Sequence, residues 1–495
     1  MSKYIIASDI GGSGTKSMAY DISNNEVSET AFCESNIYHP KPDVTIQKSK
    51  EIYDSVIQSI KKLVNSNNVE SKNIEAIIVD GQQGGIMWID EKHKPISEYD
   101  SWMDNRYAKY VKTLKIKCGN RIFKKAGTNN VIHAPKILWW KENNPNLLKK
   151  AKKMVIPATF VGGLLAGLYG EEGYIENTSL GFSGLTNKEQ NEWDQEICKE
   201  LDIPIDLLPE IKKPDEIIGY LSKEAANSLG IQEGIPIIAG VGDFPAAGLG
   251  AGIVEEGMAG DIAGTASLFF TGIKSKKPDE EEILRFVRSP IRGLWYAFAF
   301  MTGGGCLRWY RDNFFGNYKK DIYEVLNEKI GDVPLGCNGL KFFPYIGGRH
   351  HPLGVNHKGG WLGIKWSHSK EDFYRAILES IAFEYRKFLN KFNKITDIHD
   401  VKGFGGGVSS DIWNQIKSNV LNLEYKVLQE HECSLLGSVI VAGKAIGKYD
   451  DMTSKAIEFN NVKTKYLPDK NDVVEYEKYY ERYFEIIENH DSIFT

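Results

Sequence analysis

The sequence predicts an α/β protein made of two similarly built domains, and three features of the chain predict it. The first is a glycine-rich hairpin at residues 4–21, in which an apolar run ends at Asp9 and a second strand-like run follows the turn. The second is a repeat of that pattern at residues 258–272. The third is a pair of apolar strands, 74–79 and 235–239, that end in glycines and polar residues. Together they predict domains over 1–250 and 251–495 that face each other across one phosphate.

The opening hairpin has the composition of a phosphate-binding turn. Glycines at its tip allow backbone N–H groups to approach an anion closely, and several such groups form a cradle. Ser13, Thr15 and Lys16 add donors. Asp9, at the end of the first strand, is placed to serve a Mg²⁺ that accompanies the phosphate. The alternative is an ordinary hairpin with a solvated aspartate.

Two later segments of the first half suit a polyhydroxylated ligand. The strand at 74–79 is followed by the polar and glycine-rich turn 80–85. The segment 101–106 places Trp102, Asp104 and Arg106 two residues apart, which offers a stacking face, an acceptor and a fork of donors. The alternative interpretation is a surface ion pair beside a tryptophan that anchors the core, and the residues alone leave both open.

Asp243 is the candidate catalytic carboxylate of the first half. It follows the strand at 235–239, and a helix is expected to start at Pro245. A helix N-terminus would keep the carboxylate ionised. The alternative is a simple helix cap.

The second half repeats the strand and turn pattern at Asp261, Gly264 and Thr265. A glycine-rich turn at 303–305 opens a helix, and a second one at 405–407 forms a flat shelf that can admit an adenine ring. The alternative for the shelf is a tight connection between strand and helix. Amphipathic helices are expected at 49–65, 370–392 and 473–489.

Composition indicates an ordinary globular protein and excludes some classes of function. The 495 residues are 42% hydrophobic and 26% charged, with a net charge of −5, so a nucleic-acid partner is not indicated. Six scattered cysteines without metal-ligand spacing suggest reduced thiols in a cytoplasmic protein. The N-terminus lacks a signal-peptide pattern, and the apolar run 154–169 is too short for a membrane span. The oligomeric state is not fixed by the sequence, and a homodimer is compatible with it.

These pieces, in this order, resemble the FGGY carbohydrate kinases of the actin, hexokinase and ribonuclease H-like superfamily. The resemblance runs over 4–447, and its most specific part is the segment 359–379, where every spacing of the second-domain signature is kept. It implies two actin-like domains that face each other across a nucleotide cleft, with ATP and Mg²⁺ as cofactors.

The resemblance also implies roles for individual residues. Asp243 matches the general base, and Asp9 matches the aspartate of the metal–phosphate group. The nucleotide residues it implies are Ser13, Gly14, Thr15, Lys16, Gly264, Thr265, Gly304, Arg308, Gly407 and Asp411. The acceptor residues it implies are Gln82, Gln83, Gly84, Trp102, Asp104, Arg106, Asp243 and Phe244.

The implied activity is ATP-dependent phosphorylation of a hydroxyl of a free sugar or polyol, with a ketopentose first. Gly84 stands where xylulokinases usually have histidine, and Phe244 where many members have an amide. We therefore expect relaxed selectivity or a preference away from D-xylulose. The alternatives are a glycerol- or tetritol-type polyol kinase and a non-sugar ATPase or regulator of the same superfamily.

Overall fold

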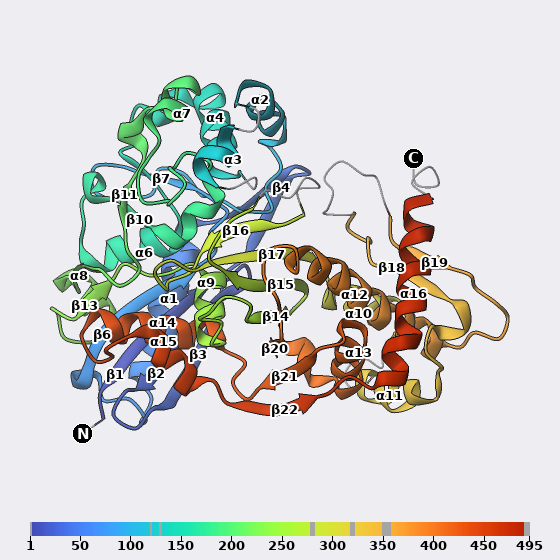
Figure 1. Ribbon diagram of the computed structural model, residues 1–495. Helices are drawn as coiled ribbons and strands as arrows, with labels where there is room; N and C mark the ends of the chain where they lie inside the picture. Colours follow the sequence, from blue (N-terminus) through green and yellow to red (C-terminus); the bar gives the residue numbers. More distant parts are fainter. Residues whose placement is uncertain are drawn as a thin grey trace. The chain divides into compact units, whose positions relative to one another are not determined.

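The computed structural model describes residues 2–118, 121–127, 131–277, 283–316, 322–348 and 358–489. The chain divides into two compact units, each with a central sheet (Figure 1). The first unit contains Met1–Val254, Phe286–Trp295 and Glu432–Phe459, and the second contains Glu255–Arg285, Tyr296–His431 and Asn460–Thr495. The first break lies close to the expected boundary at residue 250, but residues 432–459 return to the first unit.

The central sheet of the first unit has the strand order β12-β13-β6-β1-β2-β3. Its bounds are β1 Tyr4–Ile10, β2 Gly14–Asp21, β3 Glu26–Glu34, β6 Ile74–Gly81, β12 Ile217–Tyr220 and β13 Pro236–Ile238. β1 and β2 form the predicted hairpin, while β6 is parallel to both β1 and β13. Because parallel strands end at the same edge of a sheet, the residues that follow β1, β6 and β13 meet there.

Helix α1 (Ser49–Val64) covers this sheet with the apolar face that its periodicity predicts. Ile52, Val56, Ile60 and Leu63 are completely buried in the core of the unit. The apolar run 154–169 forms the expected buried helix α6 (Pro157–Ala166). The other helices of the first unit are α2 Ala108–Cys118, α3 Arg121–Ala126, α4 His133–Asn143, α5 Pro145–Leu148, α7 Gln195–Glu200, α8 Lys223–Leu229 and α9 Asp243–Gly250.

Short strands outside the central sheet lie both before residue 107 and within the segment 107–233, where helices and loops were expected. Three small sheets pair β4 with β5 and β8, β7 with β9, and β10 with β11. Their bounds are β4 Ile37–Lys41, β5 Val44–Gln47, β7 Met87–Ile89, β8 Tyr99–Asp100, β9 Lys153–Val155, β10 Tyr174–Glu176 and β11 Glu210–Lys212.

Two helices from near the end of the chain complete the first unit. They are α14 (Cys433–Ala445) and α15 (Met452–Phe459), which Figure 1 shows in orange-red beside the blue strands β1 and β2. α14 crosses α9 closely, because a Cβ on Gly437 would lie 1.9 Å from the carbonyl oxygen of Ala246. A glycine is therefore required at that crossing.

The sheet of the second unit has the strand order β17-β15-β14-β20-β21-β22, and β16 (Arg285–Arg288) pairs with β17 at its edge. The chain passes to the first unit within β16 and back within β17. The bounds are β14 Ala259–Ala263, β15 Ala266–Ile273, β17 Trp295–Thr302, β20 Asp400–Phe404, β21 Glu424–Leu428 and β22 Val462–Tyr466, with β18 Lys341–Phe343 and β19 Gly360–Leu362 as a separate pair. β14 and β15 form the second predicted hairpin, and β14 is parallel to β20.

The longest helix of the second unit, α12 (Lys370–Phe392), has the predicted bounds. Ser369 and Asp372 form a capping box at its start, which satisfies N–H groups that the first turn leaves free. Ile377, Ile381 and Phe388 are buried on its inner face. The other helices of this unit are α10 Gly304–Phe314, α11 Ile322–Lys329, α13 Asp411–Leu421 and α16 Lys470–Asn489.

The six cysteines are all free thiols, as expected, and five of them are buried. Within the described residues, no helix combines the length and the apolar content needed to cross a membrane.

Candidate functional site

Three carboxylates meet at the edge of the first unit's sheet where the parallel strands end. Asp9 on β1 is paired in register with Asp80 on β6. The end of β6 is bridged to the segment after β13 through Gly81 and Gly242, and Asp243 follows directly. The structure thus brings the predicted metal residue and the predicted base to neighbouring strand ends.

Asp9 and Asp80 are held by two serines of α14. Ser434 Oγ donates to Asp9 Oδ2 at 2.6 Å, and Ser438 Oγ donates to Asp80 Oδ2. Burial raises the pKa of Asp9, and burial together with the charge of Asp9 raises the pKa of Asp80 well above its usual range. Two adjacent carboxylates cannot both ionise at low cost, so Asp80 is the member of the pair that holds a proton more readily.

The environment of Asp243 is suited to a proton acceptor. Its Oδ1 accepts a hydrogen bond of 2.7 Å from the N–H of Phe244. Burial, with smaller contributions from the charges of Asp9 and Glu176, raises the pKa of Asp243 to about 7. The expectation that the start of α9 would simply keep this carboxylate ionised is therefore corrected, because desolvation and neighbouring charges outweigh the helix terminus.

A buried glutamate holds the backbone in front of Asp243. Glu176 Oε2 accepts from the N–H and the hydroxyl of Thr178 at 2.7 and 2.5 Å, and burial raises the pKa of Glu176 to about 7. Thr178 Oγ1 in turn accepts from the N–H of Gly242 at 3.0 Å. Gln83 joins this network, because its Nε2 donates to the carbonyl of Thr178 at 3.0 Å.

The tip of the first hairpin is open, but its later residues are engaged with other elements. Ser13 is exposed at the tip. Thr15 is buried and its hydroxyl lies 2.7 Å from Ser55 Oγ on α1, so this side chain faces the helix. Lys16 Nζ forms an ion pair with Glu432. Gly14 has φ +150° and a Cβ there would lie 2.3 Å from the carbonyl oxygen of Cys33, so the position requires glycine.

Trp102 has different surroundings in the structure from Asp104 and Arg106, the other two candidates of the segment 101–106. Trp102 is 42% exposed and packs against Gly84, where a Cβ would lie 2.9 Å from the Cβ of the tryptophan. Asp104 is buried and accepts from Arg106 Nε at 3.0 Å with both oxygens, while Nη2 of Arg106 pairs with Asp100. Asp104 and Arg106 thus form a partly buried ion pair, while the Trp102 side chain is partly exposed.

Most of the residues of the second unit that were predicted to bind nucleotide lie around its hairpin turn. The start of α10 is tied to the hairpin turn, since Gly304 N donates to the carbonyl of Gly264 at 2.9 Å. Arg308 Nη2 donates to Thr265 Oγ1 at 2.9 Å. Gly407 faces the same turn, because a Cβ there would lie 2.9 Å from the Cβ of Ala263. Asp411 is exposed at the start of α13 and accepts from the hydroxyl of Tyr466 at 2.5 Å.

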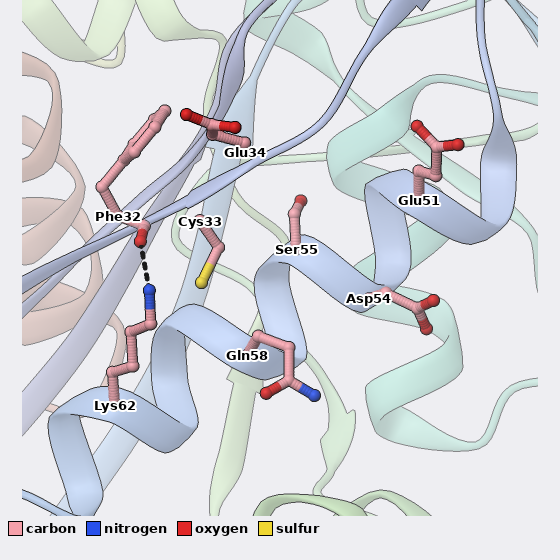
Figure 2. Close-up of a pocket in the computed structure, with 8 residues that line it drawn as sticks. All are labelled: Phe32, Cys33, Glu34, Glu51, Asp54, Ser55, Gln58 and Lys62. Atoms are coloured by element: carbon pink, nitrogen blue, oxygen red, sulfur yellow. Dashed lines mark hydrogen bonds between the residues drawn. The ribbon is translucent and has the colours of Figure 1, made fainter.

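An open hollow lies elsewhere on the first unit, between β3 and α1 (Figure 2). Its volume is about 490 Å³, and Lys62 Nζ donates to the carbonyl of Phe32 at 2.7 Å. Its lining residues are Phe32, Cys33, Glu34, Glu51, Asp54, Ser55, Gln58 and Lys62. It contains none of the predicted site residues, and it touches the hairpin through Ser55.

Several polar residues at the carboxylate edge were missed from the sequence. Asp80 had a signal, since it ends an apolar strand as Asp9 does. Glu176 lies in a segment whose sequence predicts a loop. Ser434 lies on a helix that packs against strands far away in the sequence. Within the described residues, no three histidine, cysteine or acidic side chains form a ready metal cage.

Comparisons with known proteins cover nearly the whole chain. Residues 4–250 match the N-terminal domain, and residues 261–446 the C-terminal domain, of the FGGY family of carbohydrate kinases. A xylulose kinase of Bacillus subtilis is 24% identical over 97% of this chain and 96% of its own, and a gluconokinase of the same organism is 27% identical over 91% and 89%. The structure of a gluconate kinase from Lactobacillus acidophilus has a TM-score of 0.90 at 23% identity and covers 99% of both chains.

Proposed function

The chain belongs to the FGGY family of carbohydrate kinases, and from that premise we propose that it transfers the γ-phosphoryl group of ATP to a hydroxyl of a free ketopentose. The observation that carries the proposal is Asp243, a carboxylate with a pKa of about 7 at the strand edge that also holds Asp9. A carboxylate with that pKa is partly ionised near neutral pH, and it is basic enough to remove a proton from a hydroxyl group.

In the proposed reaction Asp243 orients the acceptor hydroxyl and takes its proton. The hydroxyl oxygen attacks the γ-phosphorus in line, the bond from phosphorus to the bridging oxygen breaks, and ADP leaves. The network of Glu176, Thr178 and Gly242 fixes the backbone that carries the base. The protein therefore contributes mainly alignment and charge, which a loose transition state requires.

The carboxylates at this edge fit the Mg²⁺ that such a reaction uses. Mg²⁺ prefers hard oxygen ligands and is usually held by one or two carboxylates together with substrate phosphates. Asp9 would hold it, with the unpaired Oδ1 of buried Asp80 beside it. When bound, the ion would neutralise charge on the phosphates.

We propose that Ser13, Gly14, Thr15 and Lys16 of the first unit bind phosphate, Thr15 through its backbone. Gly264, Thr265, Gly304, Arg308, Gly407 and Asp411 of the second unit are proposed to bind the nucleotide, and their contacts around one turn support this. Gln82, Gln83, Gly84, Trp102, Asp104, Arg106 and Phe244 are proposed to form the acceptor site.

The charges near the acceptor residues favour a neutral sugar. Arg106 is paired with Asp100 and Asp104, and Lys136 donates to two backbone carbonyls with its pKa lowered to about 8 by burial. A substrate carboxylate would have to compete for cations that are already engaged. An aldonate is the second candidate, because a gluconokinase is 27% identical to the chain.

A panel of free pentuloses, hexuloses, aldonates and polyols tests the proposal through ADP release with each acceptor. We expect the fastest turnover with a ketopentose, and loss of at least about a hundredfold in Asp243→Asn, the usual weight of a general base. Asp451→Asn, an exposed carboxylate before α15, is the matched control. A rate of ADP release that is the same with and without each acceptor would instead indicate a non-sugar ATPase.

A further inference from the structure

Gln47, at the end of β5, connects two parts of the proposed site. It is completely buried, and its Nε2 donates to the carbonyl oxygens of Gly12 at 3.1 Å and Gly11 at 3.4 Å. Its Oε1 accepts from Gln82 Nε2 at 2.7 Å. One side chain thus contacts both the tip of the phosphate hairpin and the turn that follows β6.

These contacts fix the orientation of both amides. A backbone carbonyl can only accept, so the nitrogen of Gln47 must face the two glycines and its oxygen must face Gln82. Gln82 must then donate with its nitrogen, which leaves its oxygen as the free end. Gln82 is 4% exposed, and its Oε1 has no hydrogen-bond partner among the described residues. A buried acceptor without a partner is costly, so this oxygen points to a ligand that donates.

The same contacts orient the tip of the hairpin. In a trans peptide the N–H of a residue points opposite to the carbonyl of the residue before it. With the carbonyls of Gly11 and Gly12 drawn toward Gln47, the N–H groups of Gly12 and Ser13 point away from it. In the described part of the chain neither N–H has a hydrogen-bond partner. Two adjacent free N–H groups form an anion cradle.

We propose that Gln47 is a positioning residue that sets both halves of the site. Through Gln82 it presents a fixed acceptor to one hydroxyl of the sugar, and through Gly11 and Gly12 it turns two N–H groups toward the phosphate. The inference rests on the proposed kinase function. It adds a chemical requirement, because the acceptor must carry a hydroxyl that donates to Gln82 Oε1.

Two substitutions separate the two connections. Gln47→Glu keeps an oxygen for Gln82 Nε2 but places a carboxylate oxygen against the carbonyls of Gly11 and Gly12 and beside Ser35 Oγ, so the hairpin connection is lost while the Gln82 connection is kept. Gln47→Leu removes both connections. We expect Gln47→Glu to raise the KM for ATP by about tenfold with a change of less than about threefold in the KM for the sugar, and Gln47→Leu to raise both by about tenfold.

Deoxy analogues of the sugar test the donor requirement. The wild type should discriminate strongly against one analogue in a series that lacks single hydroxyls, because that analogue leaves Gln82 Oε1 unpaired. Gln47→Leu should lose about tenfold of that discrimination, since the amide of Gln82 is then free to turn.

The matched control is Gln415 of the second unit, a partly buried amide whose Nε2 donates to the carbonyl of Leu467 at 2.8 Å. Gln415→Glu and Gln415→Leu should leave both KM values within about twofold of the wild type. A purely structural role for Gln47 would lower the amount of folded enzyme without this split between the two substrates.

The inference is overturned if Gln47→Glu leaves the KM for ATP within twofold of the wild type, or if both variants change both constants equally. If Gln47→Leu does not fold, Gln47→Glu decides alone. A wild type that phosphorylates no acceptor would refute the proposed function and the Gln82 half with it. Calorimetric titration of Mg·ATP into wild type and Gln47→Glu then still decides the hairpin half.

Discussion

The two hairpins look alike in sequence, but the side chains paired across the strands next to each turn differ in polarity. They are charged in the first unit and apolar in the second. In the first unit the row next to the turn contains Lys16, Asp9 and Asp80 on three adjacent strands. The equivalent row of the second unit contains Leu268, Ile262 and Phe404 and is apolar. The row of acidic side chains therefore belongs to the first unit. At the second hairpin the groups that can bind a ligand next to the turn are those of the backbone.

The aspartates of the two hairpins differ by one residue in register. Asp9 lies one position before the last pair of its hairpin, and Asp261 lies two before the last pair of the other. A shift of one residue turns a side chain to the other face of a sheet. Asp261 is accordingly buried against α12 and α13, where Lys417 Nζ lies 2.6 Å away and Tyr385 and Tyr425 donate to it. The shared pattern predicts the turn, and the register decides what the carboxylate does.

The largest expected effect tests the structural role of Asp261. Asp261→Asn leaves the completely buried Lys417 without its counter-ion, which typically destabilises a protein by about 3–5 kcal/mol. Urea unfolding should show this loss, while turnover per folded molecule stays near the wild type. Replacing both partners, as Asp261→Leu with Lys417→Met, should recover much of the stability. Loss of turnover without loss of stability would mean that the two hairpins act alike.

The reverse pattern is expected at Asp9. Asp9→Asn should lower turnover by at least about a hundredfold and raise the Mg²⁺ concentration needed for half-maximal rate, because the charge that serves the ion is removed. Its urea midpoint should stay near that of the wild type, since Asp9 is half-buried and is paired with no buried cation among the described residues. An unchanged Mg²⁺ dependence would favour a plain hairpin.

Local patterns predicted the elements of this fold well. The hairpins, α1 and α12 follow from short-range periodicity, glycines and caps, and the structure has them at or near the expected residues. The return of α14 and α15 to the first unit was not predicted, because it depends on packing between residues more than 400 positions apart, such as Ser434 and Asp9.

The positions of two candidate carboxylates were predictable from the strands that precede them. Asp9 and Asp243 end or follow apolar strands, and the structure places them at one sheet edge. The contacts of Gln47, Asp80 and Glu176 depend on which buried polar groups the fold brings together, and sequence spacing does not encode this. The spacing of Asp104 and Arg106 was equally compatible with a ligand site and with an ion pair, and the contacts show the pair. Their part in acceptor binding remains a prediction.

A smaller effect is expected from Glu176, which has no counterpart in the second hairpin. Burial raises the pKa of both Asp243 and Glu176 to about 7, and the charge of Glu176 contributes to the raised pKa of Asp243. The base must be ionised, and the rate should therefore rise with pH through about 7. Glu176→Gln removes one of the charges that raise the pKa of Asp243, so this rise should move to lower pH by about half a unit. A shift to higher pH would contradict the assignment, and Glu200→Gln on the exposed part of α7 is the control.

The smallest effect is expected at Ser434. This residue of α14 contacts Asp9, which lies beside Asp80 in the acidic row of the first unit. Its hydrogen bond to Asp9 lowers the pKa of that carboxyl, in opposition to burial. Ser434→Ala should therefore raise the pKa of Asp9, so that a smaller fraction of the enzyme carries the charge at low pH. We expect turnover to fall by about threefold, and by more at lower pH than at higher pH, which is near the lower end of what one hydrogen bond contributes.

The control for this prediction is on the same helix, one turn further along. Ser438→Ala removes the hydroxyl that donates to Asp80. Because Asp80 holds a proton more readily than Asp9, loss of this bond should change the pH dependence of turnover less than Ser434→Ala does. Ser434→Thr, which retains a hydroxyl, should restore the wild-type profile. If the two alanine variants behave identically, α14 contributes packing alone, and the acidic row of the first unit works without help from the end of the chain.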